Sequence, residues 1–437
     1  MRRAFVLCGL LATTAGVRAD TSVRQPVVGF RVRGNSKLTD RTLGYVIHVE
    51  LGELKGDDDI AEIDQALHTS ELFETVKVTL EEAPGGVVIV ADLEDKHSWI
   101  IAPTAFLLPG NRAFGVGYAE NDLGGEDAKL LLYAQIGDHT SLGFGTYLDP
   151  AFRGTKLQFR VDLYPLHKQI VEYANADPRS QVVARETTFT FLDAGVLVGW
   201  VFQWWLIADV RFRGAYQYFR NSHLDDAALT PVKTPEKDGW DIGVQTRLTI
   251  DARHHHFGLT WGPYVQLQLE KSVPGLDSYG YGDFLLRAYY SWALFCDHEL
   301  ELRTHLSAGY HLPLNEDLTL GGVSDLRGYN VDQFRGDVRT LFRAEYSLPI
   351  TRWRFLSFRA LGFWDTGYIG NSFQRTSGDR DYLDTQKNGS HWWRNDVGAG
   401  LRVYVSTIVL PLLGLDFGYG IEGHSPEIYF EVGLTDF

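Results

Sequence analysis

An arginine and two carboxylates in the C-terminal third of the sequence have the residue types of a buried ion cluster. Arg327 belongs to the tripeptide Arg327-Gly328-Tyr329, and Glu345 and Asp365 lie in two later segments in which apolar and polar residues alternate. The planar guanidinium of arginine stays charged and binds carboxylates through paired hydrogen bonds. Two neighbouring carboxylates repel each other unless a cation lies between them. This combination is typical of a structural ion bridge.

The alternation in the two later segments predicts where these side chains point. Successive residues of a strand face opposite sides, so the apolar positions would face outward while Glu345 and Asp365 face inward. Gly328 would let the backbone approach closely, and Tyr329 would pack against the wall. We expect Arg327 to bridge both carboxylates and to hold its loop inside the enclosure that the segments form. An exposed arginine on a surface loop is the alternative.

Three consecutive histidines, His254, His255 and His256, are a second candidate, in this case for a metal site. Consecutive strand residues point to opposite faces, so the three imidazoles cannot all bind one ion. We interpret them as part of an exposed turn near Gly258. Neither a nucleophile elbow nor zinc-ligand spacing is found in the sequence. We therefore expect neither an enzyme nor a bound metal or other cofactor.

Composition limits the class of protein. The chain has 437 residues, with 41 basic and 56 acidic side chains and a net charge of −15, and it is 44% hydrophobic and 13% aromatic. The apolar content excludes general disorder. Because the chain is acidic and has no basic stripe, nucleic acid is not expected as a partner. The 45 glycines, 11 tryptophans and 21 tyrosines favour a β-rich, aromatic-rich structure.

The first nineteen residues have the pattern of a secretory signal peptide. A basic start is followed by an apolar run at 4–16 and by small residues that place cleavage after Ala19. Cys296 is the cysteine that remains, and we expect it to be a buried, unreactive residue of a strand. An export signal combined with almost no cysteine indicates the envelope of a Gram-negative bacterium.

Residues 26–96 mix strand and helix signals in the order β-α-α-β-β. The opening strand ends at Gly34-Asn35, and the run 70–76 leads from Leu67 into the second strand. These features resemble a polypeptide-transport-associated (POTRA) domain. The resemblance implies an exposed strand edge to which a client or partner segment can add by backbone hydrogen bonding. Segment 76–82 is the candidate edge, and an ordinary core strand is the alternative.

Residues 98–437 alternate apolar and polar side chains over many short segments. No run of 18 apolar residues follows the signal, so membrane-spanning helices are not expected. The apolar faces would need a second sheet to cover them in water, whereas lipid can cover them directly. The sequence therefore predicts a mainly β fold, in which a transmembrane antiparallel β-barrel of sixteen strands follows one small α+β domain. The expected strands are 98–108, 112–120, 127–137, 140–149, 155–164, 184–200, 204–219, 240–252, 261–271, 283–295, 299–310, 338–349, 354–367, 393–406, 412–421 and 426–437.

The longest gaps between these strands, 166–183, 220–239, 311–337 and 368–392, are polar and are expected to be extracellular loops. A closed barrel also requires the first strand to pair with the last. Pro103 interrupts the hydrogen bonds of the first strand and Pro426 begins the last, so this seam should be short of ladder bonds. Phe430, Val432 and Phe437 mark the closing strand. Phe437 falls on the opposite parity, which a bulge would correct.

The segment 318–329, together with 343–349 and 362–367, resembles the outer-membrane protein assembly superfamily of the BamA and TamA type, the bacterial surface antigen family. That resemblance implies a sixth extracellular loop whose Arg-Gly-aromatic motif folds back into the lumen. It also implies a seam that opens sideways and admits client strands. The implied clients are unfolded outer-membrane or secreted polypeptides. Outer-membrane lipid and periplasmic accessory proteins are further implied partners.

The resemblance places the barrel in the outer membrane of a Gram-negative bacterium and the POTRA domain in the periplasm. The implied function is insertion or export of polypeptides through the seam and the POTRA domain. A transporter of the two-partner secretion kind, dedicated to one secreted client, is the alternative. Such transporters usually have two POTRA domains and a preceding plug helix, whereas about six residues separate Ala19 from the first strand. A passive porin would have no use for the POTRA domain or the pinned loop.

Overall fold

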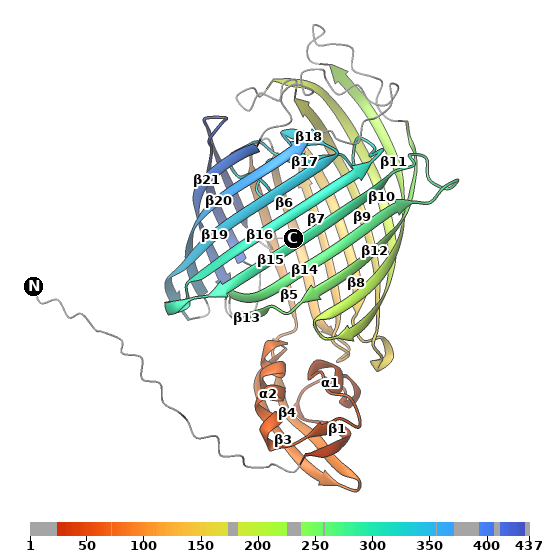
Figure 1. Cartoon of the computed structure of the whole chain (residues 1–437), viewed down its shortest axis with the longest axis vertical. Coiled ribbons are helices and arrows are strands. Elements are labelled where there is room, and N and C mark those ends of the chain that lie inside the picture. The colour runs from red at the N-terminus through yellow and green to blue at the C-terminus, as the bar shows by residue number, and fades with distance from the viewer. Residues whose placement is uncertain are drawn as a thin grey trace, which may run out of the picture.

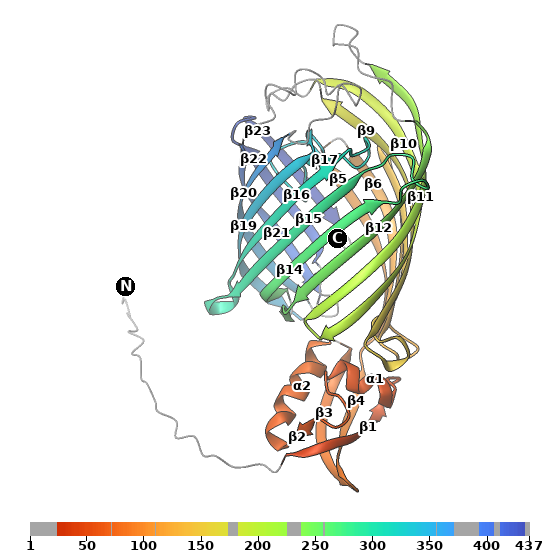
Figure 2. The same cartoon turned by 45° about the vertical axis from the view of Figure 1, so that its right-hand side comes forward.

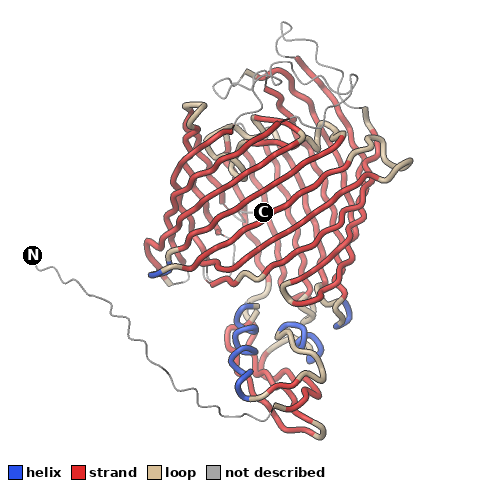
Figure 3. The backbone as a smooth tube through the Cα atoms, in the orientation of Figure 1, coloured by secondary structure: helices blue, strands red, loops and turns tan. Residues whose placement is uncertain are grey.

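The computed structural model describes most of the chain. The described residues are 24–70, 72–109, 111–173, 182–224, 237–256, 258–354, 356–370, 393–405 and 411–432. The predicted signal peptide, residues 1–19, and Phe437 lie outside them. Figures 1 and 2 show a small N-terminal domain next to one end of a large barrel, and Figure 3 shows that helix is found mainly in the small domain.

The N-terminal domain has the predicted β-α-α-β-β order, with one added two-residue strand. Its elements are β1 (Gln25–Asn35), α1 (Asp40–Val46), β2 (Leu54–Lys55), a 3-10 turn (Asp57–Asp59), α2 (Ile60–Thr69), β3 (Phe73–Ala83) and β4 (Gly86–Asp95). The sheet order is β2-β1-β4-β3, so β3 is an outer strand. Segment 76–82 therefore does lie at a sheet edge.

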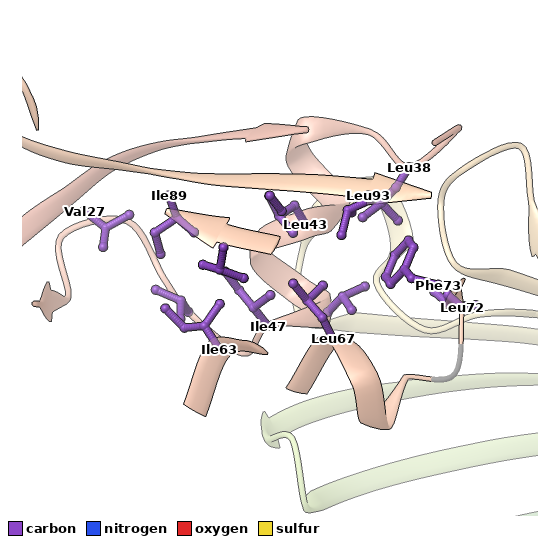
Figure 4. Packing of buried hydrophobic residues seen from close by; sticks show 14 of the residues in the cluster. Val27, Leu38, Leu43, Ile47, Ile63, Leu67, Leu72, Phe73, Ile89 and Leu93 are labelled. Atoms are coloured by element: carbon purple, nitrogen blue, oxygen red, sulfur yellow. The ribbon is translucent and has the colours of Figure 1, made fainter. Parts of the chain in front are cut away.

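Short-range chemistry explains where the helices of this domain begin. The Thr39 side chain accepts a hydrogen bond from the Thr42 amide and caps α1. Asp59 accepts from the Gly56 amide at 2.8 Å at the start of α2. Both helices pack one apolar side against the sheet, in the core that Figure 4 shows around Leu43, Ile63 and other residues.

Sixteen long strands form the closed antiparallel barrel, in agreement with the predicted number. They are β5 (Trp99–Leu108), β6 (Asn111–Leu123), β7 (Ala128–Gly137), β8 (Thr140–Asp149), β9 (Leu157–Tyr173), β10 (Val183–Gln203), β11 (Leu206–Leu224), β12 (Gly239–Asp251), β14 (Leu259–Ser272), β15 (Gly282–Ala293), β16 (Glu299–Tyr310), β19 (Val338–Trp353), β20 (Leu356–Gly370), β21 (Trp393–Val405), β22 (Pro411–Gly420) and β23 (Ser425–Val432). Apolar side chains such as Leu192, Val196 and Trp200 are exposed on the outer face, where a non-polar surrounding is required. Among the described residues, no helix has the length and apolar character to cross a membrane.

Strands β9, β10 and β11 are longer than the sequence predicted, and Figure 1 shows them rising above their neighbours. The gaps expected at 166–183 and 220–239 are therefore partly strand. In the added part, the outward side chains of β10 are polar, as at Glu186 and Thr188, so the apolar alternation that marked the strands ends before the strand pairing does.

Two smaller expectations require correction. Cys296 is exposed and lies in the 3-10 turn Phe295–Asp297 between β15 and β16. The apolar run before it continues past the end of the strand, which misplaced the boundary. His254, His255 and His256 form the short strand β13 (His254–His256) paired with β14, and the turn begins only after them, at Gly258.

The N-terminal domain contacts the barrel at the turn between β6 and β7. The Thr39 amide donates to the Gly125 carbonyl oxygen at 3.0 Å. Arg41 binds the Glu126 carboxylate at 2.7 and 2.9 Å. We call this end of the barrel the domain end and the opposite end, from which β16 leads into the long segment before β19, the loop end.

Candidate functional site: the lumen loop and the seam

The segment 311–337, between β16 and β19, contains the predicted arginine motif and folds against the inner wall. We call it the lumen loop. It includes the short paired strands β17 (Leu318–Leu320) and β18 (Phe334–Gly336). Leu326 and Tyr329 of this loop are buried with Leu341 of β19 and Ile369 of β20. The loop is thus packed as part of the barrel interior.

Arg327 lies at the centre of a buried ion cluster, with 1% of its surface exposed. Its Nε and Nη2 donate to the two Asp365 oxygens at 2.8 and 3.1 Å, and its Nη1 donates to Glu345 at 3.0 Å. The guanidinium carbon also lies 3.3 Å from the centre of the Phe363 ring. The structure therefore brings together the three residues that the sequence analysis singled out.

Several members of this cluster were missed from the sequence. Asp416 of β22 lies 3.4 Å from Arg327 Nη1, and Arg402 binds Asp416 at 2.6 Å. Arg343 lies 3.3 Å from Asp365. Asp396 of β21 accepts from the Gly328 amide at 3.1 Å. The inward parity of Asp396 and Asp416 in their strands was the signal that could have identified them.

Gly328 and Tyr329 also have specific surroundings. A Cβ on Gly328 would overlap the Gly420 amide nitrogen of β22, so the loop backbone lies directly on that strand. Tyr329 is fully buried, and its hydroxyl donates to Glu422 at 2.5 Å. Glu422 belongs to the turn between β22 and β23, which the sequence analysis did not connect with the loop.

A second contact ties the lumen loop to the opposite wall. Asp332 of the loop accepts from Lys168 of β9 at 2.5 Å. The loop therefore spans the lumen between β9 and the strands β19 to β23. Because both ends of this span rest on charge pairs, moving the loop requires breaking buried or half-buried ion pairs.

The seam between β23 and β5 closes the barrel. In the described residues it consists of the pairs Phe430–Leu107, Glu431–Phe106 and Val432–Ala105. By comparison, β5 pairs with β6 along its whole length. Phe430 and Val432 thus lie in the seam, as expected. Figure 2 shows β22 and β23 side by side on the left of the barrel.

Other buried polar clusters line the barrel interior. Arg211 lies between Asp162 and Asp193, and Arg213 binds Asp241 and Glu270. In the part of the chain that the structure describes, no group of three or more His, Cys, Asp or Glu side chains is arranged to hold a metal ion.

These features define a class of protein: a closed sixteen-strand antiparallel barrel with an arginine-anchored loop in its lumen and a seam between its first and last strands that comprises three residue pairs in the described residues. A family model described as "Omp85 superfamily domain" matches residues 122–435, and the chain belongs to the Omp85 superfamily. The resemblance to the outer-membrane protein assembly superfamily is thereby confirmed.

Solved structures show the same fold. The chain is similar to BamA from Haemophilus ducreyi lacking POTRA domains 1–3, with 15% identity, a TM-score of 0.62, and coverage of 94% of this chain and 84% of that one. It is also similar to CdiB from Acinetobacter baumannii (15% identity, TM-score 0.56, 94% and 74% covered) and to CdiB from Escherichia coli (13%, 0.60, 93% and 76%). No curated protein sequence matches the chain significantly.

Proposed function

We propose that this protein is an outer-membrane assembly and translocation factor, which inserts polypeptides into the membrane or exports them. In this proposal the barrel lies in the outer membrane of a Gram-negative bacterium. Residues 26–96 form a POTRA domain in the periplasm. The clients are unfolded outer-membrane or secreted polypeptides, and the lipid of the membrane is in contact with the outer face. The process rests on strand pairing and involves no enzymatic reaction and no cofactor.

The seam is the observation that carries this proposal. Residues Ser425–Tyr429 of β23 have no partner in β5 within the described residues, and pairing begins only at Phe430. A strand edge with free backbone donors and acceptors is a template for another strand. A client segment can add there by β-augmentation and at the same time contact lipid.

The edge of β3 supports the role proposed for the N-terminal domain. One side of β3 is paired with β4 and the other side is not paired with any strand among the described residues. Its alternating exposed residues, Thr75, Lys77 and Thr79, keep it soluble while leaving the backbone available. We propose that client or accessory segments bind this edge before they reach the seam.

A two-partner-secretion-type transporter for one secreted client remains the alternative. The lumen loop distinguishes the two routes, because it spans the lumen from Lys168 of β9 to Asp365 of β20. Export through the lumen requires displacement of the loop, whereas insertion at the seam does not. The present arrangement of the loop therefore favours the seam.

Deletion of the gene in its native host tests the proposal. Outer-membrane and culture-supernatant proteomes of the deletion strain are compared with those of the parent and of a complemented strain. Loss of several barrel proteins from the membrane would support insertion. Loss of one large secreted protein, with the membrane unchanged, would support the transporter. Two unchanged proteomes would contradict both.

A further inference from the structure

We propose that Tyr429 couples the lumen loop to the seam, so that the loop determines how readily β23 separates from β5. The inference rests on the proposed function for its biological meaning. The coupling itself is a property of the folded barrel and can be measured without a client. Its failure is therefore distinguishable from failure of the proposed function.

The Tyr429 contact lies where the pairing of the seam stops. Tyr429 is a buried residue of β23, and its hydroxyl donates to the Tyr329 carbonyl oxygen at 2.6 Å. The next residue, Phe430, is the first that pairs with Leu107 of β5. At this point β23 has β22 on one side and the lumen loop on its inner face. The loop thus supplies a bond that β5 does not.

Further contacts join the same hairpin to the loop. The Ser425 hydroxyl of β23 lies 3.4 Å from the Gly328 carbonyl oxygen. Glu422, in the turn between β22 and β23, accepts from the Tyr329 hydroxyl and, at 2.8 Å, from the Asn395 amide. The turn and the beginning of β23 are therefore fixed to the loop together.

The inner face of β22 is shaped to receive the loop backbone. A Cβ on Gly418 would overlap the Arg327 carbonyl oxygen, and a Cβ on Gly420 would lie 2.5 Å from the Gly328 carbonyl oxygen. Gly414, on the same strand and face, has room, since its nearest neighbour would be Arg402 at 3.6 Å. Side chains are thus excluded only where the loop crosses the strand.

Loss of the Tyr429 hydroxyl would act on the seam and spare the loop. The Tyr329 carbonyl also accepts from the Gly322 amide of the loop at 3.2 Å, so the internal turn of the loop keeps its bond. Tyr429→Phe keeps the packed ring and removes the link to β23. One buried hydrogen bond of this kind changes an opening equilibrium by about twofold to tenfold.

Amide hydrogen exchange of the protein in lipid nanodiscs tests the coupling. Exchange of residues 105–107 and 430–432 reports how often the seam opens, because protected amides exchange in proportion to the open population. The test variants are Tyr429→Phe and Gly418→Ala. The matched controls are Tyr419→Phe, whose side chain is exposed on the outer face of β22, and Gly414→Ala. Heat-modified mobility in gels establishes that each barrel is folded.

We expect seam exchange to rise about twofold to tenfold in both test variants and to stay at the wild-type rate in both controls. Exchange in β12 and β14, which lie opposite the seam in the strand order of the barrel, should not change. Wild-type seam exchange in folded Tyr429→Phe would overturn the role of Tyr429, whatever Gly418→Ala does. A failure of Tyr429→Phe alone to fold leaves Gly418→Ala against Gly414→Ala as the deciding pair, and equal seam exchange in those two would overturn the coupling.

Discussion

Arg327 and Asp365 meet through two parallel hydrogen bonds, with guanidinium nitrogens 2.8 and 3.1 Å from the two carboxylate oxygens, although 38 positions separate them. Both side chains are almost completely buried. This geometry depends on the fork of arginine, which a lysine does not reproduce. It fixes the lumen loop to β20 at one position along the strand.

Removal of the Arg327 guanidinium should strongly destabilise the barrel. In Arg327→Ala the buried carboxylates of Asp365 and Asp416 lose a cation, at a cost of about 3–5 kcal/mol. The free energy of unfolding of Arg327→Lys should lie between that of Arg327→Ala and that of the wild type. The measurement is the free energy of unfolding in urea, followed by tryptophan fluorescence in detergent micelles.

Arg352 provides the control for that experiment. It forms a 3.0 Å ion pair with Asp297, and both side chains are more than a third exposed. Such a surface pair contributes about 0–1 kcal/mol. If Arg327→Ala lost no more stability than Arg352→Ala, the ion cluster would not hold the loop.

Most of the predictions for the fold and the site came from the alternation of apolar and polar side chains along the strands. It gave the sixteen strands, and it turned Glu345 and Asp365 inward, where Arg327 meets them. Asp396 and Asp416 were missed although apolar residues such as Val397 and Phe417 mark the outer faces of β21 and β22, because the alternation shows only that the aspartates point inward. The alternation does not show which inward carboxylates lie beside the lumen loop.

Contacts made by turns and backbone atoms could not be read from sequence. Tyr429 binds a carbonyl oxygen, and Glu422 lies in a turn, so neither residue belongs to a recognisable motif. Their partners depend on the distance between the lumen loop and β22, which the glycines at 418 and 420 set. That distance is a property of the assembled barrel.

The contact between the N-terminal domain and the barrel should depend more on Gly125 than on the ion pair beside it. A Cβ on Gly125 would overlap the Lys37 carbonyl oxygen, so Gly125→Ala must displace the domain. The ion pair between Arg41 and Glu126 is half exposed, so Glu126→Gln should weaken the contact between the domain and the barrel by about 1 kcal/mol or less. We expect faster hydrogen exchange of the Thr39 amide in Gly125→Ala only.

Gly124 is a matched control for this change. Its φ of 75° is nearly the same as the 74° of Gly125, so alanine meets the same backbone strain at both positions. No atom lies within 4 Å of a Cβ built on Gly124. Equal Thr39 exchange in Gly124→Ala and Gly125→Ala would show that strain in the turn, and not the contact with the domain, is responsible.

Asp127, in the turn between β6 and β7, should make the protein less stable as the pH rises. Burial raises the pKa of its carboxyl above the ordinary value of 3.8, and the nearby Asp122 adds to the shift. A carboxyl with a raised pKa contributes stability at low pH that is lost as the pH rises through the raised pKa. Asp127→Asn removes the buried charge, and asparagine tolerates the φ of 55° at this position.

The free energy of unfolding of Asp127→Asn should therefore exceed that of the wild type by about 1 kcal/mol at pH 7 and by little at pH 3 to 4. Asp138, in the turn between β7 and β8, should behave in the opposite way. A hydrogen bond from the Arg112 amide lowers the pKa of Asp138, so its contribution is present at neutral pH and is lost as the pH falls through the lowered pKa. Asp138→Asn should thus lose stability at pH 7. Urea unfolding of both variants at the two pH values tests the pair, and a loss of stability in Asp127→Asn at pH 7 would contradict the assignment of a buried, unfavourable charge.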